Sequence, residues 1–138
     1  MKLIDFWNFL PGEWHFERDN SNGLHQVGTI NIVKKNVTEY FVYEKGFYIY
    51  DTSQTFFRNY KFFLIDHVLH IHGENPKDGF VHLYEIKENS HSYKHHCGND
   101  IYLFELIKFS KHEWEYAVTI SGPQKNLKII TYCKQVKN

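Results

Sequence analysis

The sequence predicts an all-β fold, an antiparallel β-barrel of about eight to ten strands preceded by one short helix. From Trp14 onward, apolar and polar residues alternate in short runs separated by Gly, Asn, Asp and Lys, which is typical of strands joined by hairpins. Aromatic residues make up 18% of the chain, and such residues favour the half-buried surface of a sheet. Closing this sheet into a barrel would remove its exposed edges and could enclose one small ligand.

The helix is predicted at the N-terminus. Apolar residues follow helical spacing from Leu3 to Leu10, and Pro11 and Gly12 end the run. The strands are expected in ten segments, the fourth of which is long enough for two: residues 13–19, 25–35, 38–46, 47–60, 61–66, 68–73, 79–88, 99–110, 113–121 and 126–135. Residues 89–98 lie outside these predicted strands.

Length and charge narrow the class of protein. A chain of 138 residues predicts a single domain over residues 1–138. Its 16 basic residues balance 16 acidic ones, so we expect neither nucleic acid nor a membrane surface as a partner. No apolar run reaches the roughly 18 residues of a spanning helix, and Asp5 and Asn8 interrupt the segment where a signal peptide would be apolar. We therefore expect a soluble, cytoplasmic protein whose Cys97 and Cys133 are free thiols.

The densest group of chemically versatile side chains lies in residues 91–102, HSYKHHCGNDIY. If a strand begins at Asp100, then Asp100 and Tyr102 point to the same face, because side chains alternate along a strand. A barrel would bring polar residues of other strands toward them. The predicted ligand-binding set is Glu44, Arg58, Tyr60, His82, His95, Cys97, Asp100, Tyr102 and Lys125.

The order of short motifs resembles a known family. FLPGEW carries the G-x-W of lipocalin-like (calycin) barrels at Gly12 and Trp14, and YEKG, RNY, DGFVHL, HHCGNDIY and SGPQKN follow it. Together they resemble an uncharacterised family of bacterial and fungal single-domain proteins of unknown function. The resemblance implies a lipocalin-like barrel whose Trp14 closes the base, and it supplies no reaction. Lipocalins usually place an Arg or Lys near the last strand over this tryptophan, a role that Lys128 or Lys134 would have to fill here.

Three interpretations of the polar set stay open. The first is a pocket for a small molecule, polar or anionic, with Arg58 binding an acidic group. The second is an enzyme on the same barrel, with Asp100 or Glu44 as base and His95 or Tyr102 as acid. The third is a purely structural network in which Arg58 pairs with Glu44 or Asp100. We favour small-molecule binding, and the sequence names neither the ligand, nor a cofactor, nor the oligomeric state.

Metal binding is the remaining alternative. The ten histidines include His70 and His72, two apart on a predicted strand, and His95 and His96 beside Cys97. The chain has no C-x-x-C pair and no H-x-x-x-H pair on a predicted helix, so we assign no metal ligands. Haem held by a barrel histidine, as in nitrobindin-like calycins, is a further alternative suggested by the resemblance, and no motif in the chain supports it.

Overall fold

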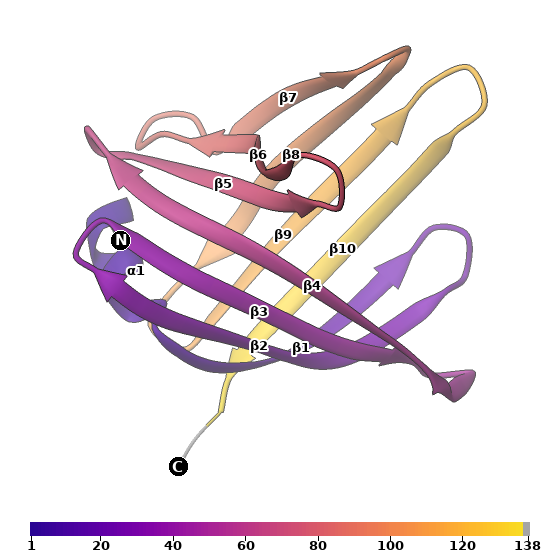
Figure 1. Cartoon of the computed structure of the whole chain (residues 1–138), viewed down its shortest axis with the longest axis horizontal. Coiled ribbons are helices and arrows are strands. Elements are labelled where there is room, and N and C mark those ends of the chain that lie inside the picture. The colour runs from indigo at the N-terminus through magenta and orange to yellow at the C-terminus, as the bar shows by residue number, and fades with distance from the viewer. Residues whose placement is uncertain (137–138) are drawn as a thin grey trace.

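The structure, a computed structural model that describes residues 1–136, contains one helix and ten strands (Figure 1). These are α1 (Leu3–Phe9), β1 (Gly12–Asn20), β2 (His25–Asn36), β3 (Glu39–Tyr48), β4 (Asp51–Ile65), β5 (Val68–Asn75), β6 (Gly79–Ile86), β7 (Ser92–Cys97), β8 (Asp100–Phe109), β9 (Glu113–Ser121) and β10 (Asn126–Gln135). The predicted all-β fold with a short N-terminal helix is confirmed.

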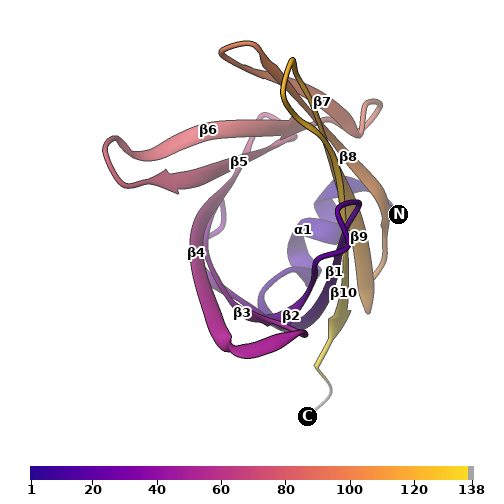
Figure 2. The same ribbon diagram turned by 90° about the vertical axis from the view of Figure 1, so that its right-hand side faces the viewer.

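The ten strands form one antiparallel sheet in the order β6-β5-β4-β3-β2-β1-β10-β9-β8-β7. Because β1 pairs with β10, the first and last strands lie in the middle of the sheet, and β6 and β7 are its two edges. Figure 2 shows the sheet curling into a nearly closed barrel that brings these edges together. Within the described residues, the backbone link between them is one isolated bridge, Lys87 with Ser90. We call this junction the β6–β7 seam.

The two ends of the barrel differ. The hairpins β1–β2, β3–β4, β5–β6, β7–β8 and β9–β10 all turn at one end, the mouth, on the right of Figure 1. The other end holds the remaining strand connections and α1. Figure 2 looks in from the mouth, and α1 crosses the far end of the barrel.

The helix is anchored at this closed end by its apolar face. Leu3, Phe6, Trp7 and Leu10 are all buried, as their helical spacing predicts. The Trp7 ring stacks on Tyr40 with centroids 3.7 Å apart, and the Tyr40 hydroxyl donates to the Trp7 carbonyl at 2.9 Å. Both the packing and the hydrogen bond therefore hold the helix against β3.

Trp14 is buried in the core, as the G-x-W motif predicts. Its indole N–H donates to the Leu10 carbonyl at 2.9 Å, and its ring meets Trp114 edge to face. The expectation that Lys128 or Lys134 covers this tryptophan is wrong. Both lysines are exposed and alternate with the inward-facing residues of β10, so they project from the outer face.

Two glycines shape the wall beside β1. Gly28 and Gly46 lie opposite each other in the β2–β3 ladder, and the ring of Phe16 lies over both. A Cβ at Gly28 would come within 2.0 Å of the Lys45 carbonyl oxygen, and one at Gly46 within 2.6 Å of the Phe56 ring. Larger residues would therefore push the strands apart or displace the Phe16 ring that packs over both glycines.

Three strand assignments differ from the sequence prediction. The segment 47–60 is divided, because Phe47 and Tyr48 end β3 and residues 49–50 form the turn before β4. The break expected after Tyr60 does not exist, because β4 runs unbroken from Asp51 to Ile65. Residues 92–97, left out of the predicted strands, form β7. This edge strand has a partner on one side only, and its residues are exposed or half-buried, so it lacks the apolar alternation by which inner strands are recognised.

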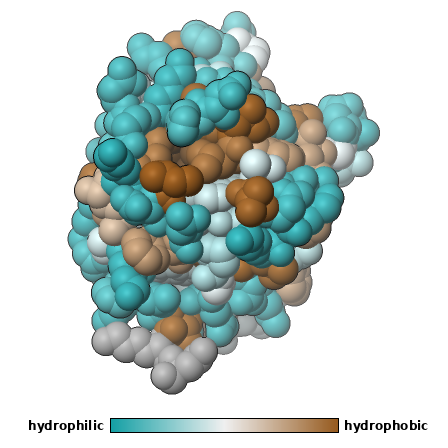
Figure 3. Space-filling view, turned by 90° about the vertical axis from the view of Figure 1, so that its left-hand side faces the viewer, coloured by the Kyte–Doolittle hydropathy of each residue, from teal (hydrophilic) through white to brown (hydrophobic). Residues whose placement is uncertain are grey.

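The outside of the closed end carries apolar surface. Figure 3 views the molecule from this side and shows apolar side chains gathered within a rim of polar ones. Exposed apolar residues of elements at this end are Met1, Ile4, Val37 and Ile65. Among the described residues, no helix has the length and apolarity needed to span a membrane.

Candidate functional site

The barrel encloses a cavity of about 460 Å³ on the mouth side of α1, a size typical of small-molecule sites. Inward-facing residues of every strand except β7, together with the β1–β2 turn, form its wall. The wall consists of Arg18, Asn20, Asn22, Leu24, Gln26, Ile30, Val42, Glu44, Tyr48, Arg58, Tyr60, Phe62, Ile71, Leu83, Tyr84, Tyr102, Phe104, Trp114, Tyr116, Val118, Ile120, Leu127, Ile129 and Thr131. It is mainly apolar and aromatic, with a few polar groups.

Arg18 and Glu44 form a buried ion pair in this wall. The guanidinium donates through Nη2 to Glu44 Oε1 at 2.5 Å and through Nη1 to Oε2 at 3.3 Å. Its Nε donates to Thr131 Oγ1 at 2.8 Å, and Nη2 also lies 3.1 Å from the Tyr116 hydroxyl. Arg18, Thr131 and Tyr116 lie side by side across β1, β10 and β9, so the ladder register builds this network.

Burial and nearby charges shift the pKa of Arg18 and of three tyrosines in the cavity wall. Burial alone would lower the pKa of Arg18, but interactions with Tyr116, once that phenol ionises, and with the Glu44 carboxylate outweigh it and raise this pKa above its ordinary value. Burial raises the pKa of Tyr116, Tyr60 and Tyr84. At neutral pH the three phenols are therefore uncharged and can donate hydrogen bonds into the cavity.

Arg58 lies on the same wall near the mouth, and its surroundings differ from those of Arg18. It lies opposite Glu44 in the β3–β4 register and faces inward with Tyr60 and Phe62. The expected pairing of Arg58 with Glu44 or Asp100 does not form, because Glu44 is bound by Arg18 and no carboxylate within residues 1–136 forms a salt bridge with Arg58. Arg58 is exposed, with its guanidinium 5.7 Å from the Phe56 ring centroid.

Aromatic stacking crosses the β6–β7 seam. Tyr84 of β6 stacks on Phe104 of β8 with centroids 4.6 Å apart, and Phe104 stacks on Tyr116 of β9 at 5.6 Å. Tyr116 in turn stacks on Trp114 at 5.5 Å. Side-chain packing thus closes the wall where the backbone ladder is interrupted.

A register shift in the β5–β6 pair helps to build this wall. Ile71 pairs with Tyr84 but His72 pairs with His82, which leaves Leu83 as an extra residue. Leu83 and Tyr84 consequently both line the cavity although they are neighbours in sequence. The bulge puts two large side chains into the cavity at the seam.

The structure divides the nine residues predicted to bind a ligand. Glu44, Arg58, Tyr60 and Tyr102 lie together on the cavity wall. Their convergence follows from barrel closure, since they come from β3, β4 and β8. The residues that do not line the cavity are His82, His95, Cys97, Asp100 and Lys125.

Three of those five lie near the mouth, at the ends of strands or in a turn. Cys97 is exposed at the end of β7, and Lys125 is exposed in the β9–β10 turn. The Asp100 carboxylate packs against Gly122, where a Cβ would come within 1.9 Å of its Oδ1. The contact between Asp100 and Gly122 joins the start of β8 to the β9–β10 turn. Both cysteines are free, as predicted, and Cys133 is buried.

His95 and His82 lie at the β6–β7 seam. The His95 ring is 6.3 Å from that of Tyr84 and 6.1 Å from that of Tyr102. Within residues 1–136 no hydrogen bond between side chains links His95, Asp100 and Tyr102, so the structure offers no assembled acid–base cluster. No histidine in the described part of the chain lines the cavity either, which leaves a histidine-held haem without support there.

Arg18 is the charged residue of the cavity wall that the sequence analysis overlooked. The signal was present, because Trp14, Phe16 and Arg18 share one face of a strand by period two. Because Arg18 lies two residues after Phe16, its side chain points to the same side as these core aromatic rings, into the barrel. Its acidic partner could not be identified in this way, since Glu44 lies 26 residues away and two strands across.

Comparison with known proteins identifies the family. The model of the family of unknown function DUF6314 matches residues 10–135, so the chain belongs to this family. No curated protein matched the sequence.

Solved structures share the fold. The S-type phycobiliprotein lyase CPES from Guillardia theta aligns with a TM-score of 0.71 at 9% identity, covering 100% of this chain and 94% of its own. A redesigned β-barrel, mFAP1, bound to DFHBI, aligns at 0.58 with 14% identity, covering 94% and 97%. A de novo designed fluorescence-activating β-barrel aligns at 0.59 with 14% identity, covering 96% and 98%. At these identities the similarity establishes the barrel fold alone.

Proposed function

We propose that this member of the DUF6314 family binds a small, partly aromatic anion inside its barrel, with the acidic group held by Arg58 at the mouth. The observation that carries the proposal is the guanidinium of Arg58, which has no salt-bridge partner in residues 1–136, on the wall of a mainly apolar and aromatic cavity. Tyr60 and Tyr102 would orient the ligand from the same wall. The apolar remainder of the ligand would lie deeper, among Phe62, Phe104 and their neighbours.

The charge of the wall favours an anion. Its charged members in the described chain are Arg18, Glu44 and Arg58, and the first two neutralise each other. The positive charge of Arg58 is left over. Buried phenols that remain protonated add donors and no negative charge. An acidic ligand therefore meets one free cation and several hydrogen-bond donors, whereas a cationic ligand meets no free carboxylate in this part of the chain.

The fold is compatible with such a ligand. The redesigned barrel mFAP1, with which this chain aligns along 94% of its length, is bound to DFHBI. A barrel of this shape can therefore hold a ligand, although the wall residues that select the ligand are this chain's own.

The test uses two dyes that differ by one acidic group. Anilinonaphthalene sulfonate is an aromatic anion, and N-phenylnaphthylamine is its neutral parent. We expect both to fluoresce on binding to the cavity, and we expect Arg58→Met to weaken the sulfonate alone by about tenfold, the lower range for a charged hydrogen bond. Titrations followed by fluorescence give the two dissociation constants.

Lys45→Met is the matched control, because it removes the same charge from the exposed outer face of β3. It should leave both dyes unaffected. Ile129→Trp, which fills part of the cavity, should weaken both. Equal loss of both dyes in Arg58→Met, or an unchanged sulfonate constant, would refute Arg58 as the anion-binding group.

A further inference from the structure

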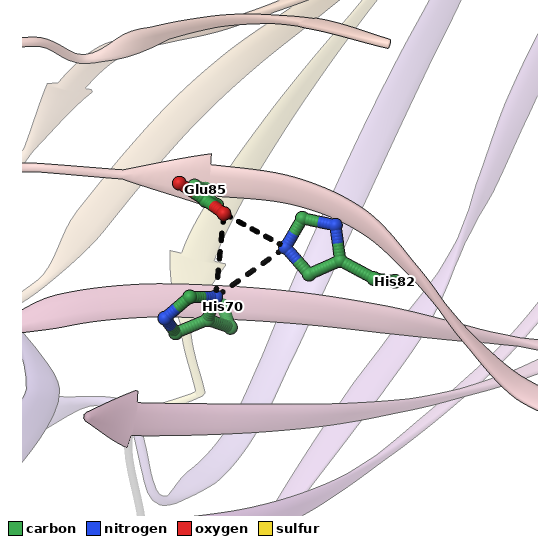
Figure 4. A group of neighbouring side chains, drawn as sticks. All are labelled: His70, His82 and Glu85. Carbon is green, nitrogen blue, oxygen red and sulfur yellow. Dashed lines mark hydrogen bonds and ion pairs between the residues drawn. The ribbon is translucent and has the colours of Figure 1, made fainter. Parts of the chain in front are cut away.

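A second group of polar side chains lies on the opposite face of the wall. His70 of β5 and His82 and Glu85 of β6 point toward one another (Figure 4). The neighbouring residues Ile71, Leu83 and Tyr84 line the cavity, whereas these three do not. They are therefore on the side of the β5–β6 hairpin that faces away from the cavity. We call them the outer triad.

The same bulge that shapes the cavity assembles the outer triad. His70 lies opposite Glu85 and His72 opposite His82, with Leu83 as the extra residue between them. In a regular strand, residues three apart such as His82 and Glu85 would face opposite sides. The bulge restores them to one side, so that three side chains from two strands converge.

The three ligand-type atoms form a compact triangle. His70 Nδ1 lies 3.3 Å from His82 Nε2, His82 Nε2 lies 3.5 Å from Glu85 Oε1, and His70 Nδ1 lies 3.9 Å from the same oxygen. Ligands about 2.0–2.1 Å from a tetrahedral Zn²⁺ are separated by about 3.3 Å. The triangle is thus close to the size that zinc requires, with the largest adjustment between His70 and Glu85.

We infer that the outer triad binds a divalent transition-metal ion of the zinc class. Two imidazole nitrogens and one carboxylate oxygen form a donor set that suits zinc and disfavours Mg²⁺, which prefers oxygen ligands. Three protein ligands leave a fourth position for water. The triad is half-buried beside the seam, with the Tyr93 ring of β7 5.8 Å from His82, so an ion can enter from solvent.

Binding would join β5 to the edge strand β6. An ion held by His70 on one strand and by His82 and Glu85 on the other adds a cross-link to the hairpin that forms one side of the seam. We expect zinc to slow hydrogen exchange of the β5 and β6 backbone amides, because opening of this hairpin would then require loss of the ion.

The experiment titrates chelator-treated full-length protein with ZnCl₂ by calorimetry. We expect one ion per chain, and at least a 10-fold weakening in Glu85→Gln and in His82→Gln, since even outer contacts of metal ligands are worth about 10–100-fold. Mg²⁺ should give no comparable binding. Substitution with Co²⁺ gives an absorption spectrum that reports whether the site is four-coordinate.

His15→Gln and Cys97→Ser are the controls, because both positions are exposed and lie outside the outer triad. Neither should change zinc affinity. Melting each variant without metal shows whether it folds, and Glu85→Gln keeps the shape of the side chain if His82→Gln is unstable. Zinc affinity that survives Glu85→Gln, equal loss in His15→Gln, or no zinc uptake at all would overturn the inference. The dye titrations test binding inside the cavity, on the other face of the β5–β6 hairpin. Either proposal can therefore fail without affecting the other.

Discussion

The two arginines of the chain lie on the same cavity wall and have opposite surroundings. Arg18 is buried, with hydrogen bonds to Glu44, Thr131 and Tyr116. Arg58 is exposed at the mouth, directly opposite the same glutamate in the ladder, and has no carboxylate partner among residues 1–136. Both side chains are guanidinium groups that line the cavity. They differ because Arg18, and not Arg58, binds Glu44, the acidic residue of the described wall.

This contrast separates a structural charge from a binding charge. A buried guanidinium with all its partners inside the protein has nothing left to offer a ligand, and its loss strands a buried carboxylate. An exposed guanidinium without a carboxylate partner contributes little to folding and remains available for an anion. The comparison can be tested by replacing each arginine in turn.

The largest effect is expected for Arg18→Met. This change leaves Glu44 buried without its cation and should lower the free energy of unfolding by about 3–5 kcal/mol. Denaturant titration followed by tryptophan fluorescence measures it, and a single transition would also support the proposal of one domain over residues 1–138.

The double variant Arg18→Met with Glu44→Gln is the control for this effect. Removing the stranded charge should recover part of the loss, because a neutral amide is less costly to bury than a carboxylate. If Arg18→Met alone is as stable as the parent protein, the ion pair is not what orders this wall.

A smaller effect is expected for Tyr84→Leu at the seam. Losing the stack with Phe104 should cost about 0.5–1.5 kcal/mol beyond the change in buried area. Amide hydrogen exchange should become faster mainly in β6 and β7, because no backbone ladder joins these two edge strands within the described structure. Tyr43→Leu, on the exposed outer face of β3, is the matched control, and a uniform increase in exchange over all strands would contradict a local role for the stack.

The smallest effect on stability is expected for Arg58→Met. Because Arg58 is exposed and forms no salt bridge in the described structure, its replacement should change the free energy of unfolding by no more than about 0.5 kcal/mol. Denaturant titration beside Arg18→Met checks this. A loss of several kcal/mol would show that Arg58 has a structural partner after all, and would weaken its assignment to a ligand.

Much of the fold could be predicted because period-two alternation and turn residues are local signals. They indicated the helix at Leu3–Phe9 and nearly every strand. They could not show which face is inside, since residues 40–45 are aromatic on both faces. The structure turns Tyr40, Val42 and Glu44 inward. Edge strand β7 was missed because it has little apolar surface to bury.

The candidate site was harder to predict, since it depends on contacts between distant strands. Alternation placed Asp100 and Tyr102 on one face of β8, and of these two Tyr102 lines the cavity while Asp100 does not. It could not determine that Glu44 binds Arg18 and not Arg58. His82 was grouped with the pocket residues because it is a polar residue of another predicted strand, without a prediction of which face of that strand it occupies. The bulge at Leu83, which has no clear mark in the sequence, turns His82 to the outer triad.

The interrupted ladder at the β6–β7 seam affects how easily the diameter of the barrel can change. In a fully laddered barrel, widening the wall breaks backbone hydrogen bonds, each worth about 0.5–1.5 kcal/mol. Here the two edges can move apart or slide by rearranging stacked rings, with the bridge between Lys87 and Ser90 as the backbone pivot. We therefore expect the interior to widen more easily than that of a fully laddered barrel, while the nine strand pairings stay intact.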